Sequence, residues 1–205
     1  MKVKILILIV IAALIIPFMY AKNKAVNRDI RHQQTILASY SFQEEPQQAD
    51  TRLSSFPFND TTITTLATFQ IRARILSRKD YRSDRGAKVS PLDLALGWKR
   101  MADPSVYKTL NIRQGSRWYF YSWKDDPPIP LGEITESSAN MHLIPANDSV
   151  KNALTKAKKG KFIRIKGFLV EVTDSSGWTW RSSLTRSDSG AGACEIIFVE
   201  AAVVE

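Results

Sequence analysis

The sequence predicts an α+β fold: a mainly antiparallel, curved β-sheet or small partly open barrel with three short helices, preceded by one N-terminal transmembrane helix. Three observations lead to it. Residues 5–20 form an almost unbroken apolar run, segments after residue 60 alternate apolar and polar side chains, and capping residues precede short apolar stripes of helical spacing. The alternating strands favour a mainly antiparallel sheet, and a slip of the apolar phase at Gly167 favours its curvature.

The apolar run has nearly the length of a membrane span. Its ~16 apolar residues at ~1.5 Å each make ~24 Å of helix, so Lys4 and Lys22 would extend toward the headgroups of a ~30 Å hydrocarbon core. A cleaved secretory signal is the alternative, but Met19 stands where such signals carry a small residue. We predict a retained signal-anchor over residues 1–21. Because Lys2 and Lys4 would otherwise cross the membrane, we expect an exported domain.

The rest of the chain divides into a polar linker and one globular domain. Residues 22–60 are polar and show no sustained period, whereas 61–205 suit a single α+β domain. The single cysteine, Cys194, excludes an internal disulfide. The net charge of +9 is concentrated in residues 71–124, which hold 13 Lys and Arg against 4 Asp and Glu. A basic face could meet anionic lipid or nucleic acid, or be an ordinary solvated surface.

Alternation and capping residues give the order of elements in the domain. Thr68–Leu76 alternates as a strand, Ser90–Pro91 opens a helix, and Asp103–Pro104 opens a second one. The further elements are strands at 117–123 and 139–144, a helix from Asn147 to Lys159 that ends at Gly160, and strands at 162–172, 178–184 and 193–199. The apolar phase slips at Gly167, which predicts a β-bulge. A helix before three consecutive strands does not match the usual plan of an oligonucleotide/oligosaccharide-binding barrel.

Three polar segments, 80–86, 137–142 and 182–195, are candidates for one shared site. Their residues could form a catalytic set in which a histidine activates a cysteine thiolate and an acid orients the pair. The catalytic candidates are His142, Cys194, Asp188, Arg186 and Asp84. The ligand-binding candidates are Arg85, Asn140, Arg181, Ser183 and Thr185. The commoner roles are a strand histidine bonded to backbone for His142 and a small buried hydrophobe for Cys194.

Other chemistry has weaker support. Residues 188–192 could form a turn whose amides accept an anion, but the lysine and helix of a phosphate loop are missing. Two histidines and no paired Cys or His spacing predict no metal site, and no cofactor is expected. The aromatic residues at 118–123, 178 and 180 could stack bases or sugars, although core packing is their commoner use.

The segments Asp84 to Trp98, Ser138 to Ala146 and Gly177 to Glu195 resemble a group of uncharacterised bacterial proteins with a single N-terminal membrane anchor and a small extracytoplasmic domain. The likeness covers roughly residues 70–200. It implies a bacterial inner-membrane protein with one span and a periplasmic domain, and it brings no activity, cofactor or substrate.

These patterns predict a membrane-anchored accessory or binding module of the cell envelope. Its contacts would be the membrane, through residues 5–20, and an envelope protein, a glycan or anionic lipid. One alternative is a Cys/His-dependent hydrolase or transferase. A second is a nucleic-acid-binding barrel, which is disfavoured because an exported domain rarely meets nucleic acid. The sequence does not give the ligand or the oligomeric state.

Overall fold

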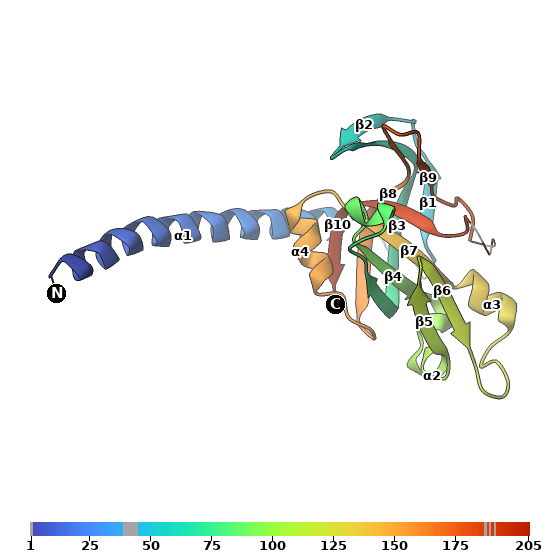
Figure 1. Cartoon of the computed structure of the whole chain (residues 1–205). Coiled ribbons are helices and arrows are strands. Elements are labelled where there is room, and N and C mark those ends of the chain that lie inside the picture. The colour runs from blue at the N-terminus through green and yellow to red at the C-terminus, as the bar shows by residue number, and fades with distance from the viewer. Residues whose placement is uncertain (1, 39–44, 187, 189, 191) are drawn as a thin grey trace.

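A computed structural model describes residues 2–38, 45–186, 188, 190 and 192–205, with the side chains of the first helix described from residue 15 on. A long helix projects from a β-rich body (Figure 1). The elements are α1 (Lys2–Ala38), β1 (Gln47–Asp50), β2 (Ser55–Phe58), β3 (Thr61–Asp80), β4 (Leu92–Gly97), α2 (Pro104–Tyr107), β5 (Asn111–Gly115), β6 (Trp118–Ser122), α3 (Leu131–Glu136), β7 (Ser138–Pro145), α4 (Asp148–Thr155), β8 (Phe162–Asp174), β9 (Thr179–Arg181) and β10 (Glu195–Val204).

Five strands pair in a closed ring. β3 pairs with β4, β4 with β7, β7 with β10, β10 with β8, and β8 again with β3. Every pairing in this ring is antiparallel except that of β7 with β10. The predicted α+β class with a mainly antiparallel, curved sheet is therefore confirmed.

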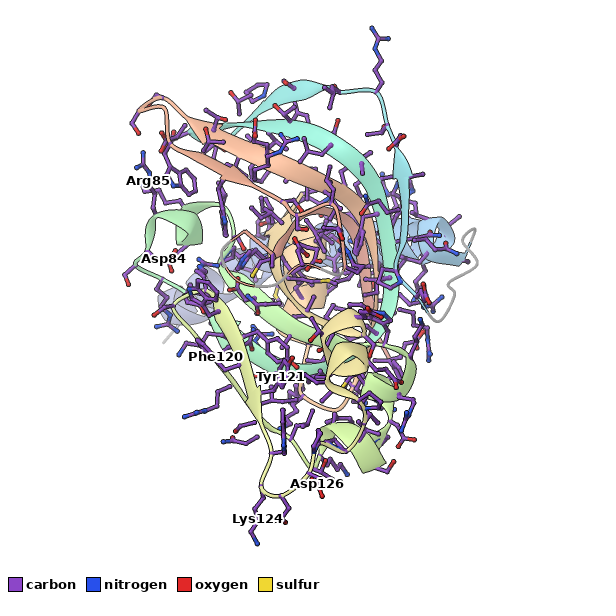
Figure 2. All side chains as sticks on the ribbon, turned by 90° about the vertical axis from the view of Figure 1, so that its right-hand side faces the viewer. Asp84, Arg85, Phe120, Tyr121, Lys124 and Asp126 are labelled. Atoms are coloured by element: carbon purple, nitrogen blue, oxygen red, sulfur yellow. The ribbon has the colours of Figure 1, made fainter. Side chains whose placement is uncertain are left out.

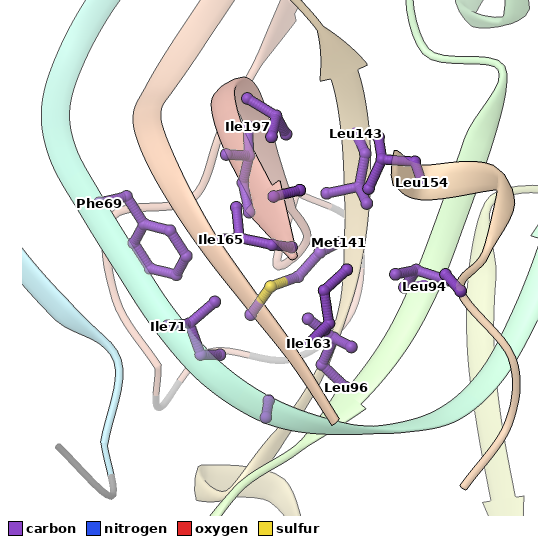
Figure 3. Close-up of a cluster of buried hydrophobic side chains, with 14 of the residues drawn as sticks. Phe69, Ile71, Leu94, Leu96, Met141, Leu143, Leu154, Ile163, Ile165 and Ile197 are labelled. Carbon is purple, nitrogen blue, oxygen red and sulfur yellow. The ribbon is translucent and has the colours of Figure 1, made fainter. Parts of the chain in front are cut away.

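All five strands send side chains into one buried cluster, and α4 adds Val150 and Leu154 from one side. Figure 3 shows this cluster, with Phe69, Met141 and Ile197 reaching it from different strands. β3 behaves as its alternation predicts: the apolar residues from Phe69 to Ile75 are buried, while Arg72 between them is exposed.

The helix predicted after Ser90–Pro91 is wrong, because Leu92–Gly97 is strand β4. Its leucines at 92, 94 and 96 alternate into the main cluster, whereas Asp93 and Ala95 face the other way and are also buried. A strand covered on both faces shows no polar face in the sequence, so its leucines could be assigned to a helical stripe.

The other predicted elements are present with shifted ends. Asp103 caps α2 by accepting a bond from the amide of Ser105, and Asn147 caps α4, which ends at Thr155 rather than at Lys159. The strands expected at 117–123, 139–144, 162–172, 178–184 and 193–199 correspond to β6, β7, β8, β9 and β10. β5 and α3 were not predicted.

The bulge predicted at Gly167 lies instead on the neighbouring strands. Pairing shifts between Val199 and Ala201 in β10 and between Thr65 and Ala67 in β3, whereas Gly167 stays in register with Val199. A Cβ at Gly167 would overlap the carbonyl oxygen of Phe198. The glycine is thus required for the close approach of β8 and β10.

The segment 22–60 differs from the expected linker. α1 continues to Ala38, and the buried Leu37 and Gln33 lie at its C-terminal end, where the helix contacts β10 and α4. The side-chain amide of Gln33 bonds the hydroxyl of Ser149 at 2.7 Å. β1 and β2 then pair with β3, so the folded body begins before residue 61.

The part of the chain whose side chains are described contains no helix that is both long enough and apolar enough to cross a membrane. Most of the anchor predicted at residues 5–20 consists of residues 5–14, whose side chains lie outside the described part. It stays a prediction.

Candidate functional site

The hairpin of β5 and β6, inserted between β4 and β7, forms one wall of the candidate site. Its two-residue turn is Ser116–Arg117, with φ of 48° and 68°, and positive φ at both residues is typical of the type I′ turn that joins such strands. Figure 2 shows Phe120 and Tyr121 on the hairpin, Lys124 and Asp126 at its far end, and Asp84 on a separate loop beyond its other end. The turn places Arg117 against that loop and β4.

Arg117 joins the hairpin to two carboxylates of the body. Its Nη1 lies 2.6 Å from Oδ1 of Asp93, and its Nη2 donates to Oδ1 of Asp84 at 2.8 Å. The guanidinium also lies 3.8 Å from the ring centroid of Tyr81. Asp93 is fully buried, whereas the side chain of Asp84 is 40% exposed. Because a buried carboxylate needs a partner, Arg117 is the main counter-charge of Asp93.

His142 belongs to this Arg117 cluster. Its Nδ1 lies 2.9 Å from Oδ1 of Asp93, off the line of a hydrogen bond, and its ring centroid is 4.6 Å from that of Trp180. The side chain is 2% exposed. His142 is thus a buried histidine on strand β7, packed between Asp93 and Trp180.

Cys194 lacks the surroundings of an activated thiolate. Its Sγ is 3.9 Å from the carbonyl oxygen of Arg117, and burial raises the pKa of the thiol to about 12, with the neighbouring Glu195 adding to the increase. Within the described part of the chain, Cys194 and His142 share no hydrogen bond. The structure therefore gives the proposed Cys–His pair no geometric support.

Glu195 is a buried carboxylate beside Cys194. Its Oε1 lies 2.5 Å from Nη1 of Arg186, yet burial outweighs this cation and raises the pKa of Glu195 to about 7. Its Oε2 has no hydrogen-bond partner among the described residues. Arg186 also donates to the amide oxygen of Gln48 at 3.3 Å. Asp188 accepts a 2.6 Å bond from the hydroxyl of Ser183.

A hollow of about 150 Å³ connects these groups. The hollow lies at one end of the ring of strands, between the hairpin, the start of β7 and the segment before β10. Its walls carry aromatic rings, two carboxylates, one amide and one guanidinium. The lining residues used below are Trp98, Trp118, Tyr119, Tyr121, Asn140, Arg186, Asp188, Ala193, Cys194 and Glu195.

The structure gathers some of the predicted site residues and separates others. Asn140, Arg186, Asp188 and Cys194 line the hollow. Asp84 and His142 belong to the adjacent Arg117 cluster. The remaining candidates are not among the lining residues. Arg85 pairs with Asp174 at 2.7 Å and Arg181 with Glu171 at 2.9 Å. Ser183 donates to Asp188 of the lining and also to the carbonyl of Thr185, at 3.0 Å.

Sequence reasoning missed Arg117, Asp93 and Trp98, and it placed Glu195 in the polar segment 182–195 without naming it as a candidate residue. The one usable signal was Asp93, a single charge inside a leucine run, which must find a partner once the run is buried. Of the predicted aromatic residues, Tyr119 and Tyr121 pack half-buried against the body, whereas Trp118 is 41% and Phe120 50% exposed. Among the described residues no group of three His, Cys, Asp or Glu side chains could hold a metal ion.

Comparisons with protein-family models, with curated proteins and with solved structures found no match to this chain. The features of the chain that bear on its function are therefore the hollow, the Arg117 cluster and the order of the strands.

Proposed function

We propose that the chain is a tethered binding module whose ligand occupies the hollow beside the hairpin. The observation that carries this proposal is the combination of aromatic walls with a buried carboxylate oxygen that has no partner among the described residues. Binding sites are typically concave and mostly apolar, with a few well-placed polar groups.

The order of the strands supports this location. The five ring strands β3, β4, β7, β8 and β10 are strands one to five in chain order. Around the ring they follow the order one, two, three, five, four, and strand four closes the ring by pairing with strand one. We infer that the ring is a barrel of the oligonucleotide/oligosaccharide-binding type, with α4 between its third and fourth strands. Such barrels bind ligands on the face of strands two and three and through the loops between strands one and two and strands four and five.

The polar residues lie in these places. Asp93 and Asn140 are on the second and third strands, Asp84 is in the first of the two loops, and Arg186 and Asp188 are in the second. In the sequence, the helix before the last three predicted strands does not match the usual plan of such a barrel. That helix falls where this class of barrel can accommodate it, since β9 is a short addition outside the ring.

The two alternative functions receive less support. A thiol with a pKa of about 12 is a poor nucleophile at neutral pH, which weakens the case for a hydrolase or transferase. The arginines around the site are matched by carboxylates: Arg117 by Asp93 and Asp84, Arg186 by Glu195, Arg85 by Asp174 and Arg181 by Glu171. Little basic charge is left there for a phosphate backbone, which disfavours nucleic acid.

The membrane and the envelope enter this proposal through the predicted anchor. α1 runs without a break from Lys2 to Ala38, where its end docks on the body, so it would hold the domain at a fixed distance from the bilayer. We propose a single-pass inner-membrane protein with a periplasmic domain, whose partner is an envelope protein, a glycan or anionic lipid.

The test is a binding panel on the full chain in detergent micelles, read by calorimetry. The probes are a chito-oligosaccharide, phosphatidylglycerol added to the micelles, a dT12 oligonucleotide, and small amines with short peptides. We expect at least one probe other than dT12 to bind the wild-type chain and to lose affinity in Ala193→Phe, which fills the hollow. Ala25→Phe, on the exposed surface of α1 and away from the hollow, is the matched control. If no probe binds in this way, the proposal fails.

A further inference from the structure

We propose that the hollow is specific for a primary ammonium group on a short aliphatic chain, and that Glu195 and Asp188 supply its counter-charges. This inference rests on the proposed function, because it names the ligand chemistry of the same hollow.

Glu195 is the first of the two carboxylates that would bind the ammonium group. Its side chain is 1% exposed and lines the hollow, and Arg186 reaches only Oε1 of the carboxylate. Oε2 has no partner among the described residues. A buried carboxylate oxygen left without a donor is costly, and an ammonium N–H would remove that cost by forming a charge-assisted bond.

The charge of the lining favours a cation. With Glu195 ionised, the described residues that line the hollow include two carboxylates, Glu195 and Asp188, and one guanidinium, that of Arg186. Arg186 is neutralised by Glu195 at 2.5 Å, and one negative charge is left over. An anionic ligand would meet this surplus charge and would have to displace Glu195 from its arginine.

The aromatic walls favour the same ligand. The hollow is lined by four aromatic rings: Trp98, which directly follows β4, and Trp118, Tyr119 and Tyr121 of the hairpin. Aromatic faces attract alkylammonium groups within about 6 Å of the ring centroid, and this attraction grows when the cation leaves water. The same walls accept the methylene groups that carry the ammonium.

The size of the hollow limits what can enter. A volume of about 150 Å³ holds a benzene-sized molecule. A four-carbon amine fits this space, and so does the side chain of a lysine whose backbone stays outside. The ligand is therefore either a free small amine or a lysine-bearing peptide, and the experiment separates the two.

Calorimetry at pH 8 on the full chain compares n-butylammonium with n-butanol, which has the same length and no charge. A second pair is acetyl-Gly-Lys-Gly-amide and its norleucine analogue. We expect each amine to bind at least about ten-fold more tightly than its neutral analogue, a difference within the range of one buried charge-assisted bond. Tighter binding of the lysine peptide than of butylammonium would identify a polypeptide as the source, and the reverse order a free amine.

Glu195→Gln and Asp188→Asn test the carboxylates. Both substitutions keep the shape of the side chain, and each should remove most of the preference for the amine. The control is Glu136→Gln, which removes the same charge from the exposed surface of α3 and should leave the preference unchanged. Circular dichroism confirms that each variant is folded.

Two results would overturn the inference: equal affinity for butylammonium and butanol, or a preference that survives in both carboxylate variants. If no amine binds but another probe of the panel does so and loses affinity in Ala193→Phe, the ammonium inference fails and the binding module stands. If no probe binds, both fail.

Discussion

Replacing Arg117 with alanine tests whether one side chain fixes the hairpin to the body. The substitution removes the 2.6 Å contact with Asp93, the 2.8 Å contact with Asp84 and the stacking on Tyr81. Asp93 is fully buried and would lose its main counter-charge. Breaking a buried ion pair in this way costs about 3–5 kcal/mol. A domain of ordinary stability has about 5–15 kcal/mol in total, so we expect a marginally stable or unfolded variant.

Guanidinium unfolding followed by circular dichroism gives the free energy of unfolding of each variant. Asp84→Asn is the control, because its carboxylate is 40% exposed and an exposed pair contributes about 1 kcal/mol at most. Asp93→Asn in the background of Arg117→Ala should recover at least about half of the loss, since no buried charge then remains unpaired. A loss below about 1 kcal/mol for Arg117→Ala, or no recovery in the double variant, would refute this reasoning.

Three further predictions concern packing, the buried carboxylate and the thiol. Gly167→Ala should lower the free energy of unfolding, measured by chemical denaturation, by at least about 3 kcal/mol or prevent folding, because its Cβ would overlap the Phe198 carbonyl. The control is Gly132→Ala, which has open space around it in α3 and should change this free energy by about 1 kcal/mol at most. Burial raises the pKa of Glu195 to about 7, so the contribution of this group to the free energy of unfolding is largest below about pH 4.5 and falls by about 3 kcal/mol as the pH rises to about 7. Glu195→Gln should abolish this pH dependence in a series of thermal melts, and a wild-type slope in the variant would contradict the prediction. Because the pKa of the Cys194 thiol is about 12, its reaction with iodoacetamide at pH 7.5 should be at least about 100-fold slower in the folded chain than in urea. Equal rates would favour the thiolate enzyme instead.

The sequence predicts the strands that have one face in the core and the other in solvent. β3 has its apolar side chains inside and Arg72 in solvent, so a period of two is visible. β4 is buried on both faces and looks like part of a helix. Gly167 shows that something unusual happens in β8, but only the structure shows that the bulges lie on the partner strands.

The candidate site was predictable in part for a related reason. Polar residues in the segments around Asn140 and Arg186 indicate a site, and the structure does gather them. The partners of Arg117, however, are 24 and 33 residues earlier in the chain, and only the docking of the hairpin brings them together. Glu195 looks like a surface acid in the sequence. Its burial follows from sharing a strand face with Ile197, which points into the core.

The hairpin connects the stability of the Arg117 cluster to the proposed binding site. A two-stranded hairpin is marginal by itself, and this one turns through Ser116 and Arg117, two residues other than glycine at positive φ, which adds local strain. Its position therefore depends on the ion pairs of Arg117 and on the packing of Tyr119 and Tyr121. Those two tyrosines and Trp118 are also a wall of the hollow. A ligand that binds only the docked hairpin must stabilise the docked state, so weakening the Arg117 cluster must weaken binding as well, although Arg117 does not itself line the hollow.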